Sequence, residues 1–191
     1  KGTVFPPMKL LFDACVLYPT VMREMLMGTM EISGDTPFWS ERILEEWARA
    51  ARKIGPTGEA QARGEIALLR ARWPKAEAIW AASLETRLWL PDENDKHVLA
   101  AAIASSADLI VTLNKQDFPR GTLREEGLDR IDPDTLLMQI FQRHEVEMKT
   151  LAGDLTAKAC ALSGKSWEVG PLLKKARLPR LAKALARSSH A

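Results

Sequence analysis

The chain has 191 residues, of which 46% are hydrophobic, and its formal net charge at pH 7 is +2. This length and apolar content are sufficient for one α/β domain with a smaller addition. The sequence shows no apolar run near the roughly 20 residues of a membrane span and no signal-peptide hydrophobic region. The two cysteines, Cys15 and Cys160, match neither a zinc site nor a disulfide framework. We therefore expect a soluble protein of the reducing cytoplasm.

The amino-terminal part begins with a predicted strand. Residues 8–12 read MKLLF, an apolar run typical of a buried strand, and Asp13 follows directly. This places a carboxylate at the carboxyl end of the first strand. Helical spacing then predicts a helix over 20–27, and glycine and proline predict a loop over 28–37.

The next helix is predicted from its cap. Ser40 is a favourable N-cap for a helix that extends to about Lys53. An apolar stripe runs along one face of this helix, and Glu46 lies on its flank, whereas Glu45 points to the opposite side. If one of these two acids faces a cleft at the core, we expect it to be Glu46.

The most informative stretch is 91–119, which reads PDENDKHVLAAAIASSADLIVTLNKQDFP. Apolar residues at helical spacing predict a helix over about 94–105, with acids in its first turn. The apolar run 109–113 predicts a buried strand. Residues 87–90 form a second plausible strand before the helix, so the unit is interpreted as strand, helix, strand with parallel strands.

Polar side chains are expected to meet at one edge of this sheet. Asp92 and Asp95 follow one predicted strand, and Asn114 and Asp117 follow the next. Asp13 follows the first strand of the chain. Because ligands of open α/β sheets bind at the carboxyl ends of the strands, these side chains define the candidate site.

The remaining segments are predicted to be mostly helical. We expect helices over 59–72 and 74–83, a short strand within 123–131, a helical stretch over 135–160 that is interrupted near Gly153 at most, and two short helices within 167–187. The fold class is therefore α/β, with a central parallel sheet of about four strands flanked by helices.

The carboxyl end differs in composition from the rest of the chain. The composition changes near Met148, and we predict an α/β domain over 8–132 and a small helical, basic annex over 133–191. From Ser163 onward there are seven Lys or Arg residues against one acid, Glu168. A basic tail of this kind predicts a surface for phosphates or for an acidic partner.

The predicted edge favours a hard divalent cation. Several carboxylates in one place repel one another unless a positive charge lies among them. Oxygen ligands without a His or Cys cluster select Mg²⁺ or Mn²⁺. Such an ion activates water and neutralises charge on a phosphodiester under attack, so metal-dependent phosphodiester hydrolysis is the leading chemistry. The candidate residues are Asp13, Glu46, Asp92, Asp95, Asn114 and Asp117.

Four runs of sequence also carry a family resemblance. They are DACVLYP from Asp13, SERILEEWARA from Ser40, DENDKHVLAAAIASSADLIVT from Asp92 and NKQDFP from Asn114. Together they resemble the PIN-domain ribonucleases. Among these the chain is most similar to VapC-type toxins of bacterial toxin–antitoxin pairs, in the subgroup with a helical carboxyl-terminal extension.

The resemblance implies a PIN-like fold and an endoribonuclease that uses Mg²⁺ or Mn²⁺. Asp13, Glu46 and Asp95 match the first three family acids. The fourth acid commonly follows the Thr of the last strand, but this position is Asn114 here, and Asp117 is the nearest carboxylate that could replace it. The loss of this charge puts a second metal position in doubt.

The resemblance also implies partners, and two further residues are candidates for the outer part of the site. Thr112 is that Thr of the last strand. For Asp92, the roles of ligand and of outer support for the ligands both stay open. An RNA substrate, a cognate antitoxin that covers the cleft and a homodimer are implied by the family, with no membrane partner.

Structural interpretations of the same residues stay open at this stage. Asp92 and Asp95 could act only as helix caps, and Glu46 could simply be solvated. Cys15 is interpreted as a small buried residue rather than a nucleophile, and His97 as a surface residue or one near the helix cap.

Three other functions are alternatives for this sequence. A deoxyribonuclease of the flap-nuclease type would use the same cleft. A haloacid-dehalogenase phosphatase would need a second Asp at the position of Cys15, which counts against it. An inactive binding module would keep the cleft for a partner, and Asn114 would be the first sign of its decay.

Overall fold

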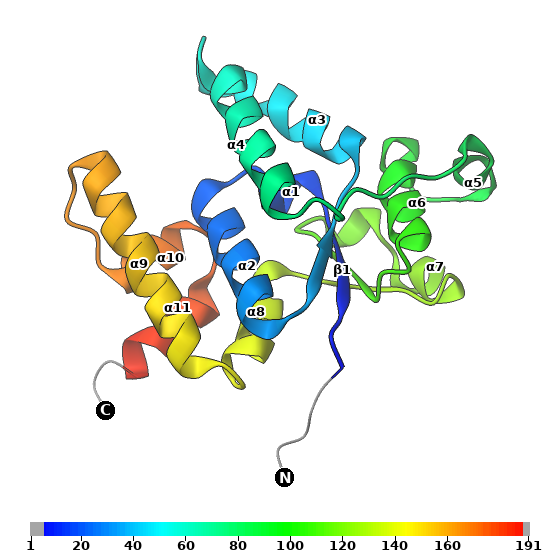
Figure 1. The fold of residues 1–191 in the computed structure, drawn as a ribbon. Helices are drawn as coiled ribbons and strands as arrows, with labels where there is room; N and C mark the ends of the chain where they lie inside the picture. The colour runs from blue at the N-terminus through cyan, green and yellow to red at the C-terminus, as the bar shows by residue number, and fades with distance from the viewer. Residues whose placement is uncertain (1–5, 189–191) are drawn as a thin grey trace. The chain divides into compact units, whose positions relative to one another are not determined.

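A parallel sheet lies at the core of the first of two units in the computed structural model, which describes residues 6–188 (Figure 1). The first unit comprises the chain up to Tyr18 together with Asp35–Ile131. The second comprises Pro19–Gly34 together with the chain from Asp132 onward. All of the candidate residues named above lie in the first unit.

Within the described residues the sheet has four strands in the order β2-β1-β3-β4, all parallel. They are β1 (Lys9–Phe12), β2 (Thr36–Phe38), β3 (Leu109–Val111) and β4 (Asp129–Ile131). The two central strands are the most apolar, because a parallel strand buried on both faces cannot alternate with polar residues. The predicted fold class, a parallel sheet of about four strands flanked by helices, is confirmed.

The ends of β1 and β3 form one continuous edge. Leu11 of β1 is in register with Ile110 of β3, and the backbone pairing continues past both strands. The amide of Asp13 donates to the carbonyl of Val111 at 3.1 Å, and the amide of Thr112 donates to that of Ile131 at 3.1 Å. The residues that follow these strands are therefore held side by side.

The first half of this unit carries helices α1 (Ala14–Leu17), α3 (Glu41–Ala50), the 3₁₀ turn η1 (Ala51–Ile54), α4 (Gly58–Arg72) and α5 (Ala82–Arg87). The predicted cap of α3 is confirmed: Ser40 Oγ accepts a hydrogen bond from the amide of Ile43 at 3.1 Å. Such a bond fixes where the helix begins, and thereby which residues of α3 face inward.

The second half carries the 3₁₀ turn η2 (Glu93–Asp95), α6 (Lys96–Ala104), the 3₁₀ turn η3 (Lys115–Asp117) and α7 (Arg120–Glu125). Helix α6 confirms the helix predicted over 94–105. Its alanine-rich sequence is buried from His97 to Ala102, which allows a close approach to the sheet.

The strand predicted over 87–90 is wrong. Arg87 ends α5, and the next three residues have no regular structure. The fourth strand is instead β2, inside and just beyond the segment predicted as a loop. Pro37 disfavours a strand in this segment because proline has no N–H donor. However, β2 lies at the edge of the sheet, where one missing donor is tolerated.

The helix predicted over 74–83 is also wrong for most of its length, since only the last two of these residues belong to α5. The amide of Trp39 donates to the carbonyl of Ala76 at 3.0 Å, and the amide of Ala78 donates to the carbonyl of Trp39 at 2.8 Å. This backbone pairing beyond β2 uses the hydrogen-bonding groups that a helix would need for itself.

The second unit is helical throughout its described part. It contains α2 (Thr20–Ser33), α8 (Pro133–Phe141), α9 (Glu145–Ser163), α10 (Val169–Lys175) and α11 (Pro179–Ser188). Helix α2 is longer than predicted because it continues through Gly28. A β-carbon at Gly28 would lie 2.6 Å from Leu151 of α9, so the glycine allows α2 and α9 to pack closely.

A buried carboxylate fixes α11 in this unit. The side chain of Asp134 on α8 accepts hydrogen bonds from the amides of Arg180 and Leu181, at 2.9 and 3.0 Å. These amides are in the first turn of α11, where a negative charge also compensates the helix dipole. The helical stretch predicted over 135–160 is interrupted at 142–144, between α8 and α9, and α9 continues through Gly153, where the sequence predicted the only possible break. The division into a domain over 8–132 and an annex over 133–191 stays a prediction.

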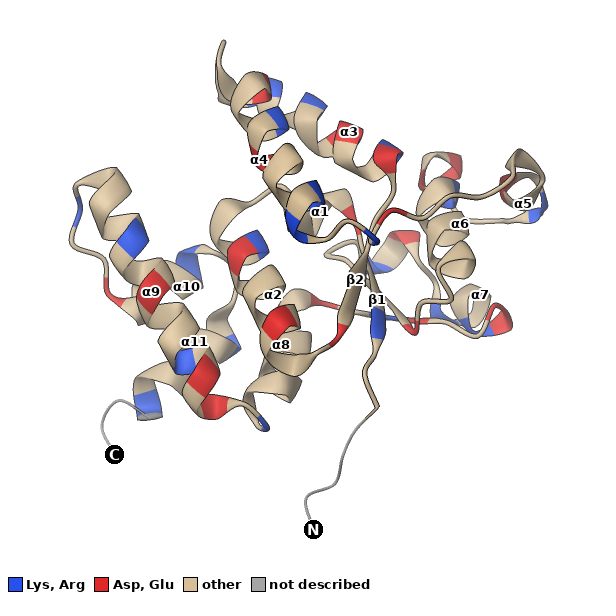
Figure 2. Cartoon of the chain, viewed as in Figure 1, with Lys and Arg blue, Asp and Glu red and all other residues tan. Residues whose placement is uncertain are grey.

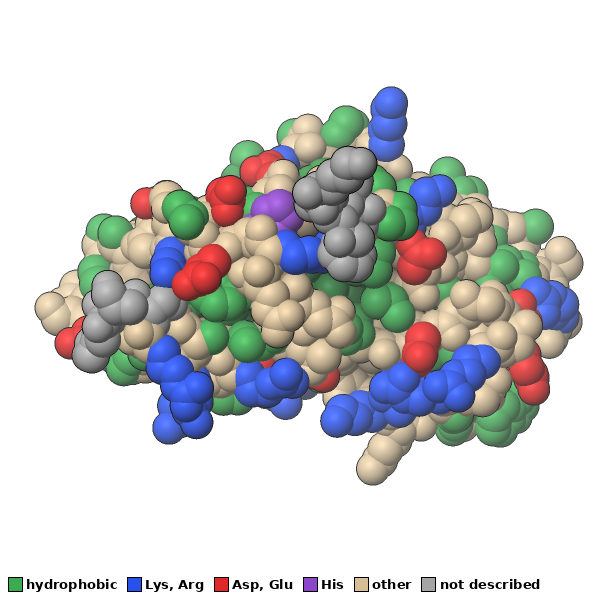
Figure 3. Space-filling model, turned by 90° about the horizontal axis from the view of Figure 1, so that it is seen from below, with side chains coloured by type: hydrophobic (Ala, Val, Ile, Leu, Met, Phe, Trp, Pro, Cys, Tyr) green, Lys and Arg blue, Asp and Glu red, His purple; other side chains and the backbone are tan. Residues whose placement is uncertain are grey.

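Basic residues gather on the last two helices (Figure 2). The exposed bases of α10 and α11 are Lys174, Lys175, Arg180, Lys183 and Arg187. On the face drawn in Figure 3, Lys and Arg side chains project from the surface singly and in short rows. Among the helices that the structure describes, none is long and apolar enough to cross a membrane.

Candidate active site

Asp13 is a buried carboxylate at the end of β1. It is 5% exposed and caps α1, where its Oδ1 accepts a hydrogen bond from the amide of Ala14 at 2.8 Å. Its Oδ2 accepts a hydrogen bond from the hydroxyl of Thr112 at 2.9 Å. Burial nevertheless raises the pKa of Asp13, because these hydrogen bonds only partly offset the loss of water.

Thr112 connects the two central strand ends. It is 1% exposed, and its hydroxyl donates to Asp13 while it accepts a hydrogen bond from the amide of Asn114 at 3.1 Å. One hydroxyl therefore orients the Asp13 carboxylate and shapes the turn that follows β3. Sequence reasoning treated Thr112 as a supporting residue, and the structure places it in contact with Asp13.

Cys15 lies beside the same carboxylate. Its sulfur is 3.5 Å from Oδ2 of Asp13 and 3.6 Å from the hydroxyl of Thr112. Burial, followed by the charge of Asp13, raises the pKa of the Cys15 thiol to about 12. A thiol with this pKa stays protonated at neutral pH, so Cys15 cannot serve as a thiolate nucleophile.

Glu46 reaches the site from α3, with a side chain that is 43% exposed. Its Oε1 lies 2.7 Å from Nε2 of His97. After burial and other contributions, the negative charge of Glu46 also helps to raise the pKa of Asp13 and the pKa of Asp95. Glu46 is therefore close enough to Asp13 and Asp95 for its charge to act on both carboxyls.

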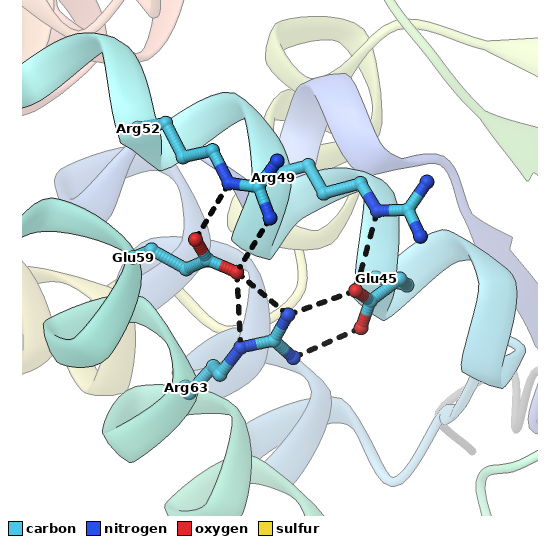
Figure 4. Close-up of polar contacts among 5 residues, drawn as sticks. All are labelled: Glu45, Arg49, Arg52, Glu59 and Arg63. Carbon is cyan, nitrogen blue, oxygen red and sulfur yellow. Dashed lines mark hydrogen bonds and ion pairs between the residues drawn. The ribbon is translucent and has the colours of Figure 1, made fainter.

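Glu45, one residue earlier, is turned the other way into an ionic network (Figure 4). Arg63 of α4 contacts Glu45 with two nitrogens, at 2.8 and 2.9 Å, and also bonds to Glu59 at 2.8 Å. Two further arginines complete the network. Arg49 of α3 lies 3.3 Å from Glu45, and Arg52 of η1 lies 2.6 Å from Glu59. This network joins α3 to α4 and fixes which face of α3 carries Glu46.

Asp95 shows most clearly that acidic residues converge. It ends η2, directly before α6. The pKa of Asp95 is raised to about 6, first by burial and then by the charges of Asp117, Asp13, Asp92 and Glu46. Carboxylates from four other positions in the chain therefore act on this one side chain.

The last three candidates lie in more exposed positions. Asp92 caps η2, where its Oδ1 accepts a hydrogen bond from the amide of Asn94 at 2.9 Å. Asn114 is exposed and precedes η3, and Asp117 is half-buried at the end of η3. Asp92 therefore has the capping role that its position predicted, and Asp92 and Asp117 both add negative potential at Asp95.

His97 lies near the start of α6, as one of its two interpretations predicts, but the other interpretation, a surface residue, is wrong. It is 1% exposed on α6 and contacts Glu46. A signal was present in the sequence, because His97 shares a helical face with Ala100 and Ala101, three and four residues later, and both are fully buried. The small side chains on that face leave room for the ring.

The donor set agrees with a hard divalent cation in its chemistry. The acids that act on one another supply only oxygen, which Mg²⁺ and Mn²⁺ prefer, and a cation would relieve the repulsion that raises the pKa of Asp95. Within the described residues, however, no group of three or more His, Cys, Asp or Glu side chains is arranged so that it could already hold a metal ion. The carboxylates share one electrostatic environment without forming a closed ligand set.

A comparison with protein families agrees with this arrangement. The model of the PIN domain family matches residues 9–116, which is more than half of the chain. The chain belongs to the PIN domain family. The match begins in β1 and ends in η3, so Asp13, Glu46 and Asp95 all lie within the PIN domain, and Asp117 lies one residue beyond the match. Comparison with curated proteins and with solved structures gave no match. PIN domains are generally nucleases that use divalent metals, which identifies nuclease chemistry as the function class of the family.

Proposed function

We propose that this PIN domain is an endoribonuclease that depends on Mg²⁺ or Mn²⁺ and hydrolyses RNA phosphodiesters at the edge formed by the ends of β1 and β3. The observation that carries the proposal is that four other carboxylates lie close enough to Asp95 to act on it, and their charges add to burial in raising its pKa to about 6. A folded chain gains nothing in stability from such crowding, so the arrangement points to a cationic ligand.

The residues of the site have different proposed roles. Asp13, Glu46 and Asp95 are the proposed principal oxygen ligands, and Asn114 and Asp117 complete the site. Thr112 would hold Asp13 in one orientation through its hydroxyl, and Asp92 would order η2 so that Asp95 faces the edge. Because Asn114 is neutral where the family commonly has an acid, the negative charge available for a second cation is smaller.

A bound divalent cation would lower the pKa of an attacking water molecule and neutralise charge on the phosphate. The carboxylates themselves repel one another in its absence, which favours side-chain positions that are farther apart. Glu46 is exposed enough to change rotamer, so it could swing toward Asp13 and Asp95 when a cation binds.

The biological role follows from the resemblance to VapC-type toxins. We propose that the protein is the toxin of a bacterial toxin–antitoxin pair and acts in the cytoplasm, with a cognate antitoxin as its partner and a homodimer as its assembly. In this proposal the helices that follow Asp132, including the basic α10 and α11, would form the carboxyl-terminal extension of that subgroup.

A catalytically inactive binding module is the second candidate. The neutral Asn114 and the open arrangement of the acids favour it. A related deoxyribonuclease would use the same edge and differ only in its substrate.

The deciding experiment compares single-stranded RNA and DNA of one sequence, incubated with purified protein and Mg²⁺, Mn²⁺ or EDTA. We expect the metal to be required, RNA to be cut in preference to DNA, and Asp13→Asn to abolish cleavage without unfolding the protein. Unchanged cleavage by Asp13→Asn would refute the assignment. Absence of cleavage together with no Mn²⁺-induced change in melting temperature would favour the binding module.

A further inference from the structure

His97 is an unusual buried side chain. It is 1% exposed, and neither ring nitrogen has a hydrogen-bond partner among the described residues. The Nε2 atom is only 2.7 Å from Oε1 of Glu46, which is the length of a charge-assisted hydrogen bond. The ring N–H is not directed at this oxygen, so the pair is a close contact that a small rotation would convert into a hydrogen bond.

The two partners differ in their freedom to move. The imidazole is enclosed by α6 and its neighbours, whereas the Glu46 side chain is 43% exposed on α3. Rotation of Glu46 is therefore the movement available to the pair. His97 is the fixed member, and it lies two residues after Asp95 on the same segment of chain.

We infer that His97 is a positioning residue that fixes the Glu46 carboxylate relative to Asp13 and Asp95. The inference rests on the proposed function. The contact joins α3, which carries Glu46, to the segment that carries Asp95, so it sets the spacing of two acids that are distant in sequence. When Glu46 turns to bind a cation, the ring N–H can donate to the other carboxylate oxygen and hold that orientation.

A purely structural role for His97 agrees less well with these contacts. A buried imidazole without hydrogen bonds costs stability relative to an apolar side chain of similar size. The ring must also lie against the one acid of α3 that faces the site. The neighbouring acid of α3, Glu45, forms an ion pair with Arg63 at 2.8 Å, so a glutamate of this helix can be paired without a histidine.

The test measures Mn²⁺ binding by the loss of the electron paramagnetic resonance signal of free Mn²⁺. We compare wild type, His97→Phe and His97→Gln, each alone and combined with Glu46→Gln. Phenylalanine keeps the ring volume and removes both nitrogens, whereas glutamine keeps an N–H donor. We expect His97→Phe to weaken Mn²⁺ binding about tenfold, in the range typical of residues that orient metal ligands. We expect His97→Gln to restore most of this loss, and His97→Phe to have no further effect in the Glu46→Gln background.

Thr29→Val is the matched control. Thr29 on α2 is also fully buried, and its hydroxyl has no hydrogen-bond partner among the described residues, but α2 carries none of the site residues. It should leave Mn²⁺ affinity unchanged. Melting in EDTA identifies a variant that fails to fold, in which case His97→Gln alone decides the outcome.

The results separate the two proposals. Equal Mn²⁺ affinity in wild type and His97→Phe would overturn the role of His97 and leave the nuclease proposal intact. An equal loss with and without Glu46 would also overturn it, because His97 would then act by another route. A wild-type protein that neither binds Mn²⁺ nor cuts RNA would overturn the nuclease proposal, and the role of His97 with it.

Discussion

The hydroxyl of Thr112 donates a hydrogen bond to Oδ2 of Asp13 across 2.9 Å, which joins the ends of β1 and β3 between residues 99 positions apart. Both side chains are almost completely buried. The orientation of the Asp13 carboxylate therefore depends on a residue of another strand, and the geometry of the site depends on the register of the sheet.

Replacement of Thr112 by valine should destabilise the protein. Valine has a similar shape but leaves Oδ2 of Asp13 without this donor, and a buried polar group that loses its partner costs about 1–3 kcal/mol. Urea unfolding should show this decrease in the free energy of unfolding. Thr112→Ser keeps the hydroxyl and serves as the control, so an equal loss in both variants would contradict the role of the hydrogen bond.

Asp95→Asn should stabilise the metal-free protein at neutral pH. The pKa of Asp95 is about 6 in the folded chain, against an ordinary value of 3.8, so ionisation of this group opposes folding. The contribution of Asp95 to stability should therefore become less favourable as the pH rises from 3.8 to about 6.

The melting temperature in EDTA measures this effect. At pH 7 we expect Asp95→Asn to melt about 2–4 °C higher, which corresponds to about 1 kcal/mol after solvent screening of a partly exposed carboxylate. The difference should vanish below pH 3.8, where the wild-type carboxyl is protonated in both states. Asp92→Asn, which keeps a capping side chain, should give a smaller increase.

Two neighbouring glutamates of α3 should differ in function. Glu46→Gln removes a proposed ligand, and we expect it to lower metal-dependent RNA cleavage at least tenfold. Glu45→Gln weakens only the exposed network with Arg63 and should leave cleavage near the wild-type rate. Initial rates on one RNA substrate at saturating Mg²⁺ measure both variants. Similar rates for the two would contradict the assignment of Glu46.

The network between α3 and α4 should stabilise the fold only above acidic pH. Hydrogen bonding to Arg63 lowers the pKa of Glu45 to about 2, and hydrogen bonding to Arg52 lowers the pKa of Glu59 to about 2. Both values are below the ordinary 4.5, so this stabilisation is complete above pH 4.5 and is lost as the pH falls toward 2.

Arg63→Met provides the measurement. Its urea midpoint should lie below that of the wild type at pH 7 and approach it near pH 2. Because these side chains are exposed, 1 M NaCl should also reduce the difference. A difference independent of pH and salt would indicate that Arg63 acts through packing of its aliphatic chain.

The basic surface of α10 and α11 should bind RNA phosphates. The probe is a fluorescent single-stranded RNA, with Asp13→Asn used so that the RNA stays intact. Lys174→Gln, Lys183→Gln and Arg187→Gln combined should lower affinity and decrease the steepness of its salt dependence by about 2, given roughly 0.7 per phosphate contact. An unchanged salt dependence would contradict RNA binding at this surface and would favour an acidic protein as its partner.

The central part of the fold could be predicted because local and long-range requirements agree there. The apolar runs of β1 and β3 are buried and the Ser40 cap fixes α3, so the sequence predicts both the place of Asp13 at the end of β1 and the helix face that carries Glu46. The position of Asp95 was predicted by a partly incorrect argument, because the strand expected before it does not exist.

The errors have physical causes that local patterns do not contain. Strand β2 contains Pro37, and only its place at the sheet edge makes this tolerable. The segment after α4 has helix-forming alanines, yet its backbone pairs with Trp39. His97 is polar on a helix face that is otherwise small and buried, and its contact with Glu46 depends on how α3 and α6 meet.

The chain leaves the first unit at Tyr18 and returns to it at Asp35, so the helical unit is assembled from two stretches of sequence. Helix α2 lies in the inserted stretch, and the side chains that it buries are mostly methionines, including Met22, Met25 and Met30. A shortened protein that ends after β4 would keep α2 but lose α8 and α9, which pack against it. Such a fragment should aggregate, so a minimal nuclease cannot be obtained by cutting the chain at one point.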